Sequence, residues 1–313
     1  DQFNTAASGG DIIFLNRRPI NAVAELENSR VGVGQIADYR YNLDPGFPQP
    51  QSVGALPSNS TGEWISASMV SPRQHHVHIG VAQQLGSSTA VTVNYSRTEG
   101  RNNWRLENAN YRINGSPRIL ASQLEAASGD PNQMARVDIL GTGGGSQYDA
   151  LTFRITQRFA KANFQAHYTL AKSESFGGRT GNRSGASAPQ DNADPNADIN
   201  WGPNQIDERH RFVLSGVFEL PYGIQLSPVV QLASARPYQL TAGRDLNRDG
   251  TNNDFYVGAD GNQVSVNSAR GDHTFVSDLR ATKFVELGGA RRLGLFFELL
   301  NVANTVNFGS QYQ

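Results

Sequence analysis

The stretch LTFRITQRFAKANFQAHYTLAKS (Leu151–Ser173) alternates apolar and polar residues in two arms, with a short polar break between them. Successive side chains of a β-strand point to opposite faces, so each arm has one apolar face and one polar face. The stretch therefore predicts a β-hairpin that turns at Ala160–Lys161. Its polar face carries Arg154, Arg158, Gln165 and His167.

The same alternation predicts three further hairpins along the chain. These three hairpins lie near residues 76–98, 209–234 and 275–302, in addition to the first hairpin near 148–173. Their turns are expected at Gly86–Ser88, Pro221–Gly223 and Gly288–Gly289, where short runs of Gly, Pro or small polar residues suit tight hairpins. The sequence thus predicts about eight strands.

The connections between these hairpins are long: Glu99–Gln147, Glu174–Glu208 and Ala235–Thr274. Because long loops alternate strictly with tight turns, every long loop is expected on the same side of the sheet. Within them, Arg118–Ser128 is predicted as a short amphipathic helix, and the polar, low-complexity stretch Gly181–Asp198 as mobile. Residues 1–75 are interpreted as an external loop and lead-in, and residues 76–313 as the barrel segment.

Composition excludes several classes of protein. The chain has 313 residues, a formal net charge of −1 and no cysteine. This charge leaves no basic footprint for nucleic acid, and the missing cysteines exclude a disulfide scaffold. No run of 18 apolar residues predicts a membrane-spanning helix, but a barrel strand crosses with about ten alternating residues. The polar start DQFNTAASGG is not a signal peptide, which predicts a mature chain or a piece of a longer one.

Alternation alone fits both a secreted β-sandwich and a membrane barrel, because a half-buried soluble strand alternates in the same way. Strand length favours the barrel. The candidate strands run roughly ten to twelve residues, whereas soluble strands usually have about five or six. We therefore predict an all-β fold, an antiparallel transmembrane β-barrel seen in part. Its apolar face meets outer-membrane lipid, and its polar face, with Arg154, Arg158, Gln165 and His167, lines a hydrated lumen.

Several motifs resemble one known family. They are YDALTFRITQRF (148–159), YTLAKS (168–173), NWGPNQIDERHRFVLSGVFELPYG (200–223), QLASARPYQLTAGRDLNRDGTNNDF (231–255) and ELLNVANTVNFG (298–309). In this order they resemble the carboxyl-terminal barrel region of TonB-dependent outer-membrane receptors, specifically the Oar-like group. The resemblance implies uptake of a solute across the outer membrane of a Gram-negative bacterium, driven by the TonB complex through a plug domain.

The chain departs from the family pattern in its length. Such receptors resemble barrels of about twenty-two strands filled by a plug. Neither a plug nor a TonB-contacting box is found, and the family's last strand would follow the terminal NFGSQYQ. The chain is therefore expected to be an internal part of a longer receptor. No residue selects among siderophores, vitamins, sugars and peptides as the solute.

Two alternatives to transport stay open at this stage. The first is a surface barrel that acts as an adhesin or structural protein without transport. The second is a secreted, soluble β-sandwich. An enzyme is not expected, because no Ser/His/Asp or paired-carboxylate arrangement has a suitable spacing.

The sharpest local motif is GRDLNRDGTNND. Asp245, Asn247 and Asp249 occupy positions 1, 3 and 5 of a calcium-type loop, with Gly250 at the turn position. Thr251 would add a backbone carbonyl, and Asn253 and Asp254 further oxygens; position 12 holds Tyr256 instead of a bidentate Glu. The competing interpretation is a turn whose Asp and Asn side chains bind their own backbone. The sequence thus offers a Ca²⁺ loop or a plain turn.

Three weaker motifs complete the candidates. HHVH (His75–His78) puts His76 and His78 on one strand face, but two ligands do not close a metal site and lumen-facing histidines are a sufficient explanation. IDERHRF (Ile206–Phe212) is interpreted as a charged collar where a strand leaves the membrane. GTGGGS (Gly141–Ser146) lacks the residues of a phosphate loop and is interpreted as a flexible approach to Tyr148.

Overall fold

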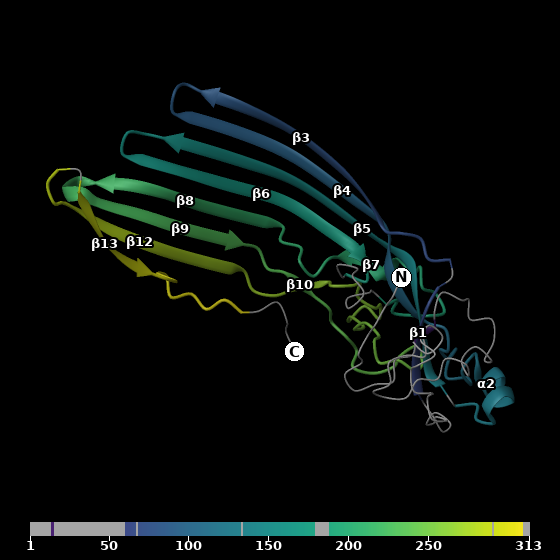
Figure 1. Ribbon diagram of the computed structural model, residues 1–313. Helices are drawn as coiled ribbons and strands as arrows, with labels where there is room; N and C mark the ends of the chain where they lie inside the picture. Colours follow the sequence, from purple (N-terminus) through teal and green to yellow (C-terminus); the bar gives the residue numbers. More distant parts are fainter. Residues whose placement is uncertain are drawn as a thin grey trace, which may run out of the picture.

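The computed structural model describes residues 14–15, 60–66, 68–132, 134–178, 188–289 and 291–308. Eight long antiparallel strands follow one another in space as they do in sequence (Figure 1). They are β3 (Arg73–Leu85), β4 (Thr89–Asn108), β5 (Met134–Arg158), β6 (Ala162–Phe176), β8 (His210–Leu220), β9 (Ile224–Ala233), β12 (Thr274–Glu286) and β13 (Arg292–Leu299).

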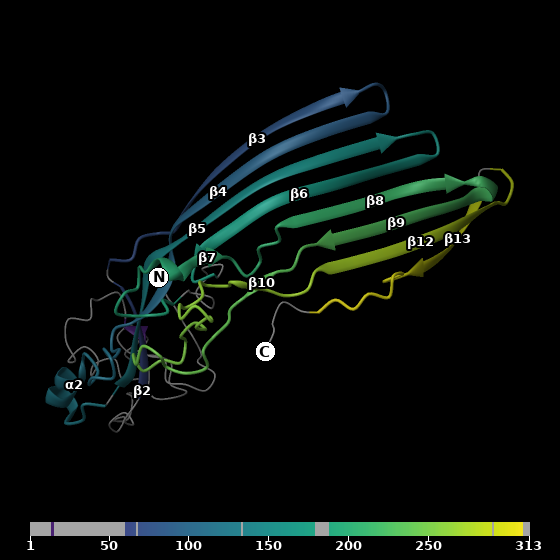
Figure 2. The same ribbon diagram turned by 180° about the vertical axis from the view of Figure 1, so that it is seen from behind.

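These strands form one curved sheet that does not close on itself, and Figure 2 shows the same open sheet from behind. The expected antiparallel β-barrel, seen in part, is therefore the fold that is observed. Among the described residues no second large sheet packs against either face, as the β-sandwich alternative would require. The described part of the chain contains no helix long and apolar enough to cross a membrane.

Tight turns and long loops lie at opposite ends of the sheet, as the sequence predicts. The four hairpins turn at residues 86–88, 159–161, 221–223 and 287–291, all at one end (Figure 1). The long connections gather at the other end. They include α2 (Ala121–Ser128), η2 (Asp198–Asn200), β7 (Trp201–Pro203), β10 (Pro237–Tyr238) and β11 (Ala269–Arg270). In outer-membrane barrels the end with long loops faces the outside of the cell.

Cross-strand register fixes which side chains share a face. Phe153 pairs with Val93 on β4 and with Tyr168 on β6, all on the apolar face. Arg154 pairs with His167 on the opposite, polar face. Large apolar side chains stand exposed on the apolar face, such as Ile79 at 64%, Val81 at 68% and Phe297 at 64%. Such exposure would be costly in water and is expected where lipid covers the strands.

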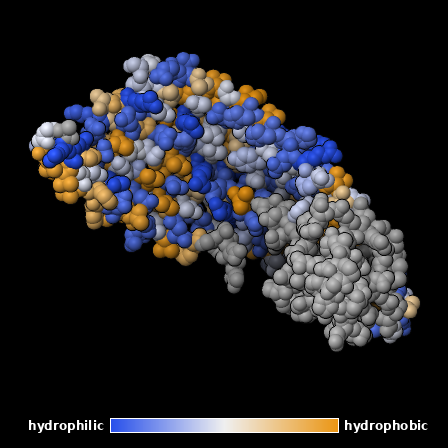
Figure 3. Space-filling model, viewed as in Figure 1, coloured by the Kyte–Doolittle hydropathy of each residue, from blue (hydrophilic) through white to orange (hydrophobic). Residues whose placement is uncertain are grey.

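Hydrophobic residues also gather at the end with tight turns. Figure 3 shows them, in orange, around the turns of the β8–β9 and β12–β13 hairpins. Leu220, Leu287 and Leu293 lie there and are exposed. The apolar band thus reaches the turns at this end of the sheet.

The structure corrects the interpretation of GTGGGS. Residues 141–146 lie inside β5, and β4 continues to Asn108, so the first long connection runs from 109 to 133 instead of from Glu99 to Gln147. The ladder is irregular between Arg101 and Arg105, as at a β-bulge. A Cβ on Gly143 would lie 2.3 Å from the Arg105 guanidinium carbon. These glycines therefore make room for side chains of β4 rather than supplying flexibility.

Three further segments bear on the predictions. The predicted helix is present as α2, which ends at Gly129 in the left-handed conformation. Of the polar stretch 181–198, residues 188–198 are described, and the Asn192 side chain accepts a hydrogen bond from the Asn108 N–H (2.8 Å). Residues 1–75 lie mostly outside the described ranges. Within them β1 (Phe14–Leu15) pairs in parallel with β2 (Ser60–Ile65), which in turn pairs in parallel with β5.

Candidate functional site: the polar face and the loop assembly above it

The predicted lumen residues share one face of neighbouring strands. Arg154 and Arg158 on β5 lie directly across from His167 and Asn163 on β6. Gln165 lies between them, and its amide donates to the Ser215 hydroxyl on β8 (3.4 Å). Their common face is determined by the register, because a shift by one residue would turn all of them to the other side. The result is a polar wall with guanidinium, imidazole and amide groups.

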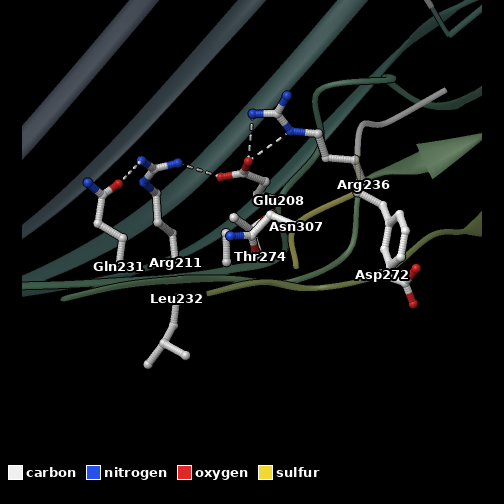
Figure 4. Close-up of a pocket in the computed structure, with 10 residues that line it drawn as sticks. Glu208, Arg211, Gln231, Leu232, Arg236, Asp272, Thr274 and Asn307 are labelled. Atoms are coloured by element: carbon white, nitrogen blue, oxygen red, sulfur yellow. Dashed lines mark hydrogen bonds and ion pairs between the residues drawn. The ribbon is translucent and has the colours of Figure 1, made fainter. Parts of the chain in front are cut away.

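A pocket of about 330 Å³ opens at the loop end of the same sheet, between β8, β9 and β12 (Figure 4). Its lining consists of Glu208, Arg211, Gln231, Leu232, Ala233, Arg236, Asp272, Thr274, Asn307 and Phe308. Register puts Arg211, Gln231, Ala233 and Thr274 on the polar face. Figure 4 shows the Leu232 side chain pointing to the opposite side from Gln231 and Arg211, as strand alternation requires.

One carboxylate organises this pocket. Glu208 accepts hydrogen bonds from Arg211 Nη1 (2.7 Å) and from Arg236 Nε (2.8 Å), and its side chain is only 13% exposed. Arg211 also donates to the Gln231 side-chain oxygen (3.2 Å). Each of these two arginine side chains is 45% exposed, and its guanidinium keeps further N–H groups for other acceptors. The pocket can therefore offer several fixed donors to a polar solute.

The segment after β13 closes one side of the pocket. The Asn307 side chain accepts from the Phe275 N–H (2.8 Å) and donates to the Phe275 carbonyl (2.9 Å). The Asn307 side chain thus takes the place of a neighbouring strand for the backbone of Phe275, because β13 pairs with β12 only from Leu279 onward. Sequence reasoning missed Arg236, Asp272, Asn307 and Phe308, because nothing local shows that a loop and a distant tail meet at the end of β8.

Asp207 and His210 of IDERHRF make contacts outside the pocket. Asp207 is 1% exposed, accepts the Ser173 N–H (2.7 Å) and pairs with Arg270 Nη2 (2.5 Å). His210 turns to the apolar face, where its Nδ1 lies 2.8 Å from the Tyr168 hydroxyl. The Asp207 contacts join β6 to the loop segment that carries Arg270, and the His210 contact joins β8 to β6.

The candidate calcium loop is folded around its own acidic side chains. Asp245 accepts from the N–H groups of Asp249 (3.0 Å) and Gly250 (2.9 Å), and Asn247 accepts from the Asp249 N–H (2.9 Å). Asp249 accepts from the Thr251 N–H (2.7 Å). These are the backbone bonds of the plain-turn interpretation.

Asp254 is the buried centre of this loop. It is 0% exposed, accepts from the Leu246 N–H (2.5 Å) and the Asn247 N–H (3.3 Å), and also accepts from the Gln190 side-chain amide. Within the described ranges, no group of three or more acidic or histidine side chains is arranged to hold a metal ion. Calcium at Asp245, Asn247, Asp249, Thr251 and Asp254 accordingly stays a hypothesis, which chelation can test.

Burial also changes the chemistry of Asp249, which is 3% exposed. Loss of water around the carboxylate raises the pKa of Asp249 above its ordinary value. Hydrogen bonds from the Thr251 N–H and from the Asn192 amide act in the opposite direction. The ionised form of Asp249 is therefore held in the loop against a desolvation cost.

Comparison with known proteins identifies the family. A family described as "Outer membrane beta barrel domain" matches residues 3–265. The chain belongs to this family. The β-barrel is consequently a protein of the outer membrane of Gram-negative bacteria, with lipid on the apolar face of its strands. No curated protein matches the β-barrel chain.

Two solved structures are similar to this β-barrel chain. One is the outer membrane transporter YddB from Escherichia coli, with 12% identity and a TM-score of 0.49, covering 79% of this chain and 31% of that one. The other is the FrpB iron transporter from Neisseria meningitidis (F3-3 variant), with 13% identity and a TM-score of 0.44, covering 78% and 29%. The chain thus spans less than a third of the length of either structure.

Proposed function

We propose that this chain is the barrel wall of a TonB-dependent receptor of the Oar-like group, which takes up a solute across the outer membrane. The observation that carries the proposal is the position of the charged pocket. It lies on the polar side of the strands, at the end where the long loops gather. A solute captured by external loops would meet this pocket first and then the wall of Arg154, Arg158, Gln165 and His167.

Family membership and motif order support this function. The outer-membrane barrel family covers most of the chain, and the five motifs between Tyr148 and Gly309 stand in the order of the receptors they resemble. The resemblance implies that a plug domain outside this chain would fill the lumen and relay energy from the TonB complex. The chemistry of the pocket favours a solute with hydrogen-bond acceptors, because its two half-exposed guanidinium groups are donors only.

The experiment that tests this proposal compares solute accumulation in cells with and without the protein. Labelled siderophores, vitamins, sugars and peptides are offered one at a time, in cells with functional TonB and in cells without it. We expect at least one solute to accumulate only when both the protein and TonB are present. If no solute does so, and cells instead lose attachment to a surface when the protein is deleted, the adhesin alternative replaces transport.

A matched pair of variants then connects uptake to the pocket. Arg236→Gln removes a pocket guanidinium, whereas Arg248→Gln removes an exposed guanidinium in the same long connection but outside the pocket lining. We expect Arg236→Gln to raise the solute concentration needed for half-maximal uptake, and Arg248→Gln to leave it unchanged. Equal effects of the two variants would remove the pocket from the proposal.

A further inference from the structure

Two histidines stand side by side on the polar face of β3, far from the pocket. His76 and His78 are separated by Val77, which points to the apolar face together with His75. Their imidazole rings are nearly parallel, with centroids 6.4 Å apart and an angle of 11° between the planes. Both side chains are exposed. The wall near β3 thus presents a pair of imidazoles toward the lumen.

Each imidazole is oriented by a hydroxyl group on the neighbouring strand. His76 Nδ1 lies 2.8 Å from Thr98 Oγ1, and His78 Nδ1 lies 2.8 Å from Ser96 Oγ. When Nδ1 carries the proton and donates to the hydroxyl oxygen, the lone pair of Nε2 is free. An oxygen acceptor on the second ring nitrogen is the arrangement that usually supports a metal-binding histidine. The same support occurs at both positions because Thr98 and Ser96 share the polar face of β4.

From this geometry we propose that His76 and His78 form a binding site for a first-row divalent transition-metal ion. Imidazole nitrogen binds Zn²⁺ at about 2.0–2.1 Å, so the two rings must swing toward each other from their present separation. Both side chains are exposed on β3, an outer strand of the sheet in this chain, so the rings have room for this motion. By the general order of affinities, Cu²⁺ binds such a site more tightly than Ni²⁺ or Zn²⁺.

Two protein ligands leave the remaining positions of the ion to water or to donor atoms of a solute. The part of the chain that the structure describes supplies no third acidic or histidine ligand here. Passage along a lumen requires binding that is favourable enough to capture an ion and weak enough to release it. An open two-imidazole site meets this requirement better than a closed one. This role rests on the proposed uptake function, whereas metal binding itself does not.

The test is a Cu²⁺ titration of the protein purified from outer membranes in detergent without a histidine tag. Calorimetry gives the affinity, and electron paramagnetic resonance gives the number of coordinating nitrogens. The wild-type protein is expected to bind one Cu²⁺ through two imidazole nitrogens. His76→Gln and His78→Gln are each expected to weaken binding by about tenfold or more. His75→Gln, one residue away on the opposite face, is the matched control and should bind like the wild type.

Two results would overturn the proposal: equal binding by the wild type and the His76→Gln/His78→Gln double variant, or an equal loss in His75→Gln.

The strand is solvent-accessible at these positions, and heat-modifiable migration on gels verifies that each variant is folded. A Ser96→Ala/Thr98→Val variant should bind several-fold more weakly, since it keeps the ligands but loses their orientation. Because the titration needs neither TonB nor uptake, failed transport with intact Cu²⁺ binding would reject the proposed function alone.

Discussion

Asp254 holds the loop 235–273 together through contacts that come from two separate segments. Its carboxylate accepts two backbone N–H groups of its own loop and the side-chain amide of Gln190, and none of it is exposed. Removing one partner of a buried hydrogen bond costs more than the bond contributes, because the remaining polar groups lose water without compensation. Asp254 is therefore expected to matter more than any exposed acidic residue of this loop.

Replacing Asp254 by Ala should open the loop. The change leaves the Leu246 and Asn247 N–H groups and the Gln190 amide without their acceptor, which corresponds to about 1–3 kcal/mol of local stability. Limited proteolysis in detergent should then cut within 235–273 faster than in the wild type. Asp260→Ala is the control, since Asp260 is exposed and accepts hydrogen bonds from nearby Asn262. Equal cleavage of the two variants would contradict the role of Asp254.

Chelation separates the two interpretations of the same loop. The acidic side chains already accept backbone N–H groups, so we expect cleavage of the wild-type loop to be unchanged by a calcium chelator. Faster cleavage that added Ca²⁺ reverses would instead establish the calcium site at Asp245, Asn247, Asp249, Thr251 and Asp254.

Asp249 gives a prediction about pH. Its pKa in the folded protein is raised by burial, so its contribution to stability is full below the unfolded pKa and is lost as pH rises through the folded pKa. Asp249→Asn keeps an oxygen to accept the Thr251 N–H and removes the desolvated charge. Hydrogen exchange of the loop should therefore be slower in Asp249→Asn than in the wild type at neutral pH, and the difference should vanish below about pH 4.

Asp260 serves as a control because its pKa is shifted in the opposite direction from that of Asp249. Bonds from Asn262 lower the pKa of Asp260, so its contribution is present above the unfolded pKa and is lost as pH falls through the folded one. Asp260→Asn should exchange slightly faster than the wild type at neutral pH. If both Asn variants shift exchange in the same direction, the burial argument for Asp249 fails.

At this scale the sequence could predict contacts between near neighbours only. The turn bonds of Asp245 and Asn247 follow from residue types a few positions apart. The bond from Gln190 to Asp254 and the meeting of Arg236 with Asn307 in one pocket could not be predicted, because they depend on how separate loops pack. The sequence thus predicted the polar wall of the candidate site, but it did not predict the pocket at the loop end of the sheet.

The hairpins are the elements that alternation predicts best. All four turns lie where short Gly-, Pro- or polar-rich breaks interrupt the pattern. Strand ends were harder to predict, because the glycines of 141–146 suggested a loop although they form part of β5. Pro228 lies inside β9 between two partner strands. The register of β8 and β9 is the same on both sides of it, although the described β8–β9 ladder has no pair at Pro228 itself, where the backbone N–H is missing.

The turn of the β8–β9 hairpin provides a prediction for a single element. Gly223 has φ +68°, and a Cβ there would lie 2.8 Å from the Phe284 carbonyl oxygen of β12. Gly86 has φ +67° in the β3–β4 turn, with nothing within 4 Å of an added Cβ. Gly86→Ala should therefore lower the free energy of unfolding by about 1–2 kcal/mol from the left-handed backbone alone, and Gly223→Ala by more.

Urea unfolding in phospholipid vesicles can compare the two glycine variants. Both carry the same backbone penalty, so a larger loss in Gly223→Ala isolates the contact between the turn and β12. Equal losses would mean that β12 moves away from the added methyl group without cost.

The molecule as a whole is a single curved sheet between two environments. Its apolar face carries large exposed side chains across all the long strands, and its polar face carries the wall and the pocket. The sequence could predict this division because successive side chains of a strand point to opposite faces. Each arm of Leu151–Ser173 therefore has apolar residues on the lipid side and polar residues on the lumen side. The sequence could not predict how the long loops pack together, because loop packing leaves no periodic signal.

Site-directed spin labelling of Leu151–Thr156 tests the central claim most directly. The chain has no cysteine, so single cysteines can carry a nitroxide in protein reconstituted into liposomes. We predict more collisions with oxygen, which partitions into lipid, at 151, 153 and 155. Collisions with a water-soluble nickel chelate should dominate at 152, 154 and 156. Low collision rates with both reagents at the odd positions, or no alternation at all, would mean that protein covers the apolar face and would contradict the account.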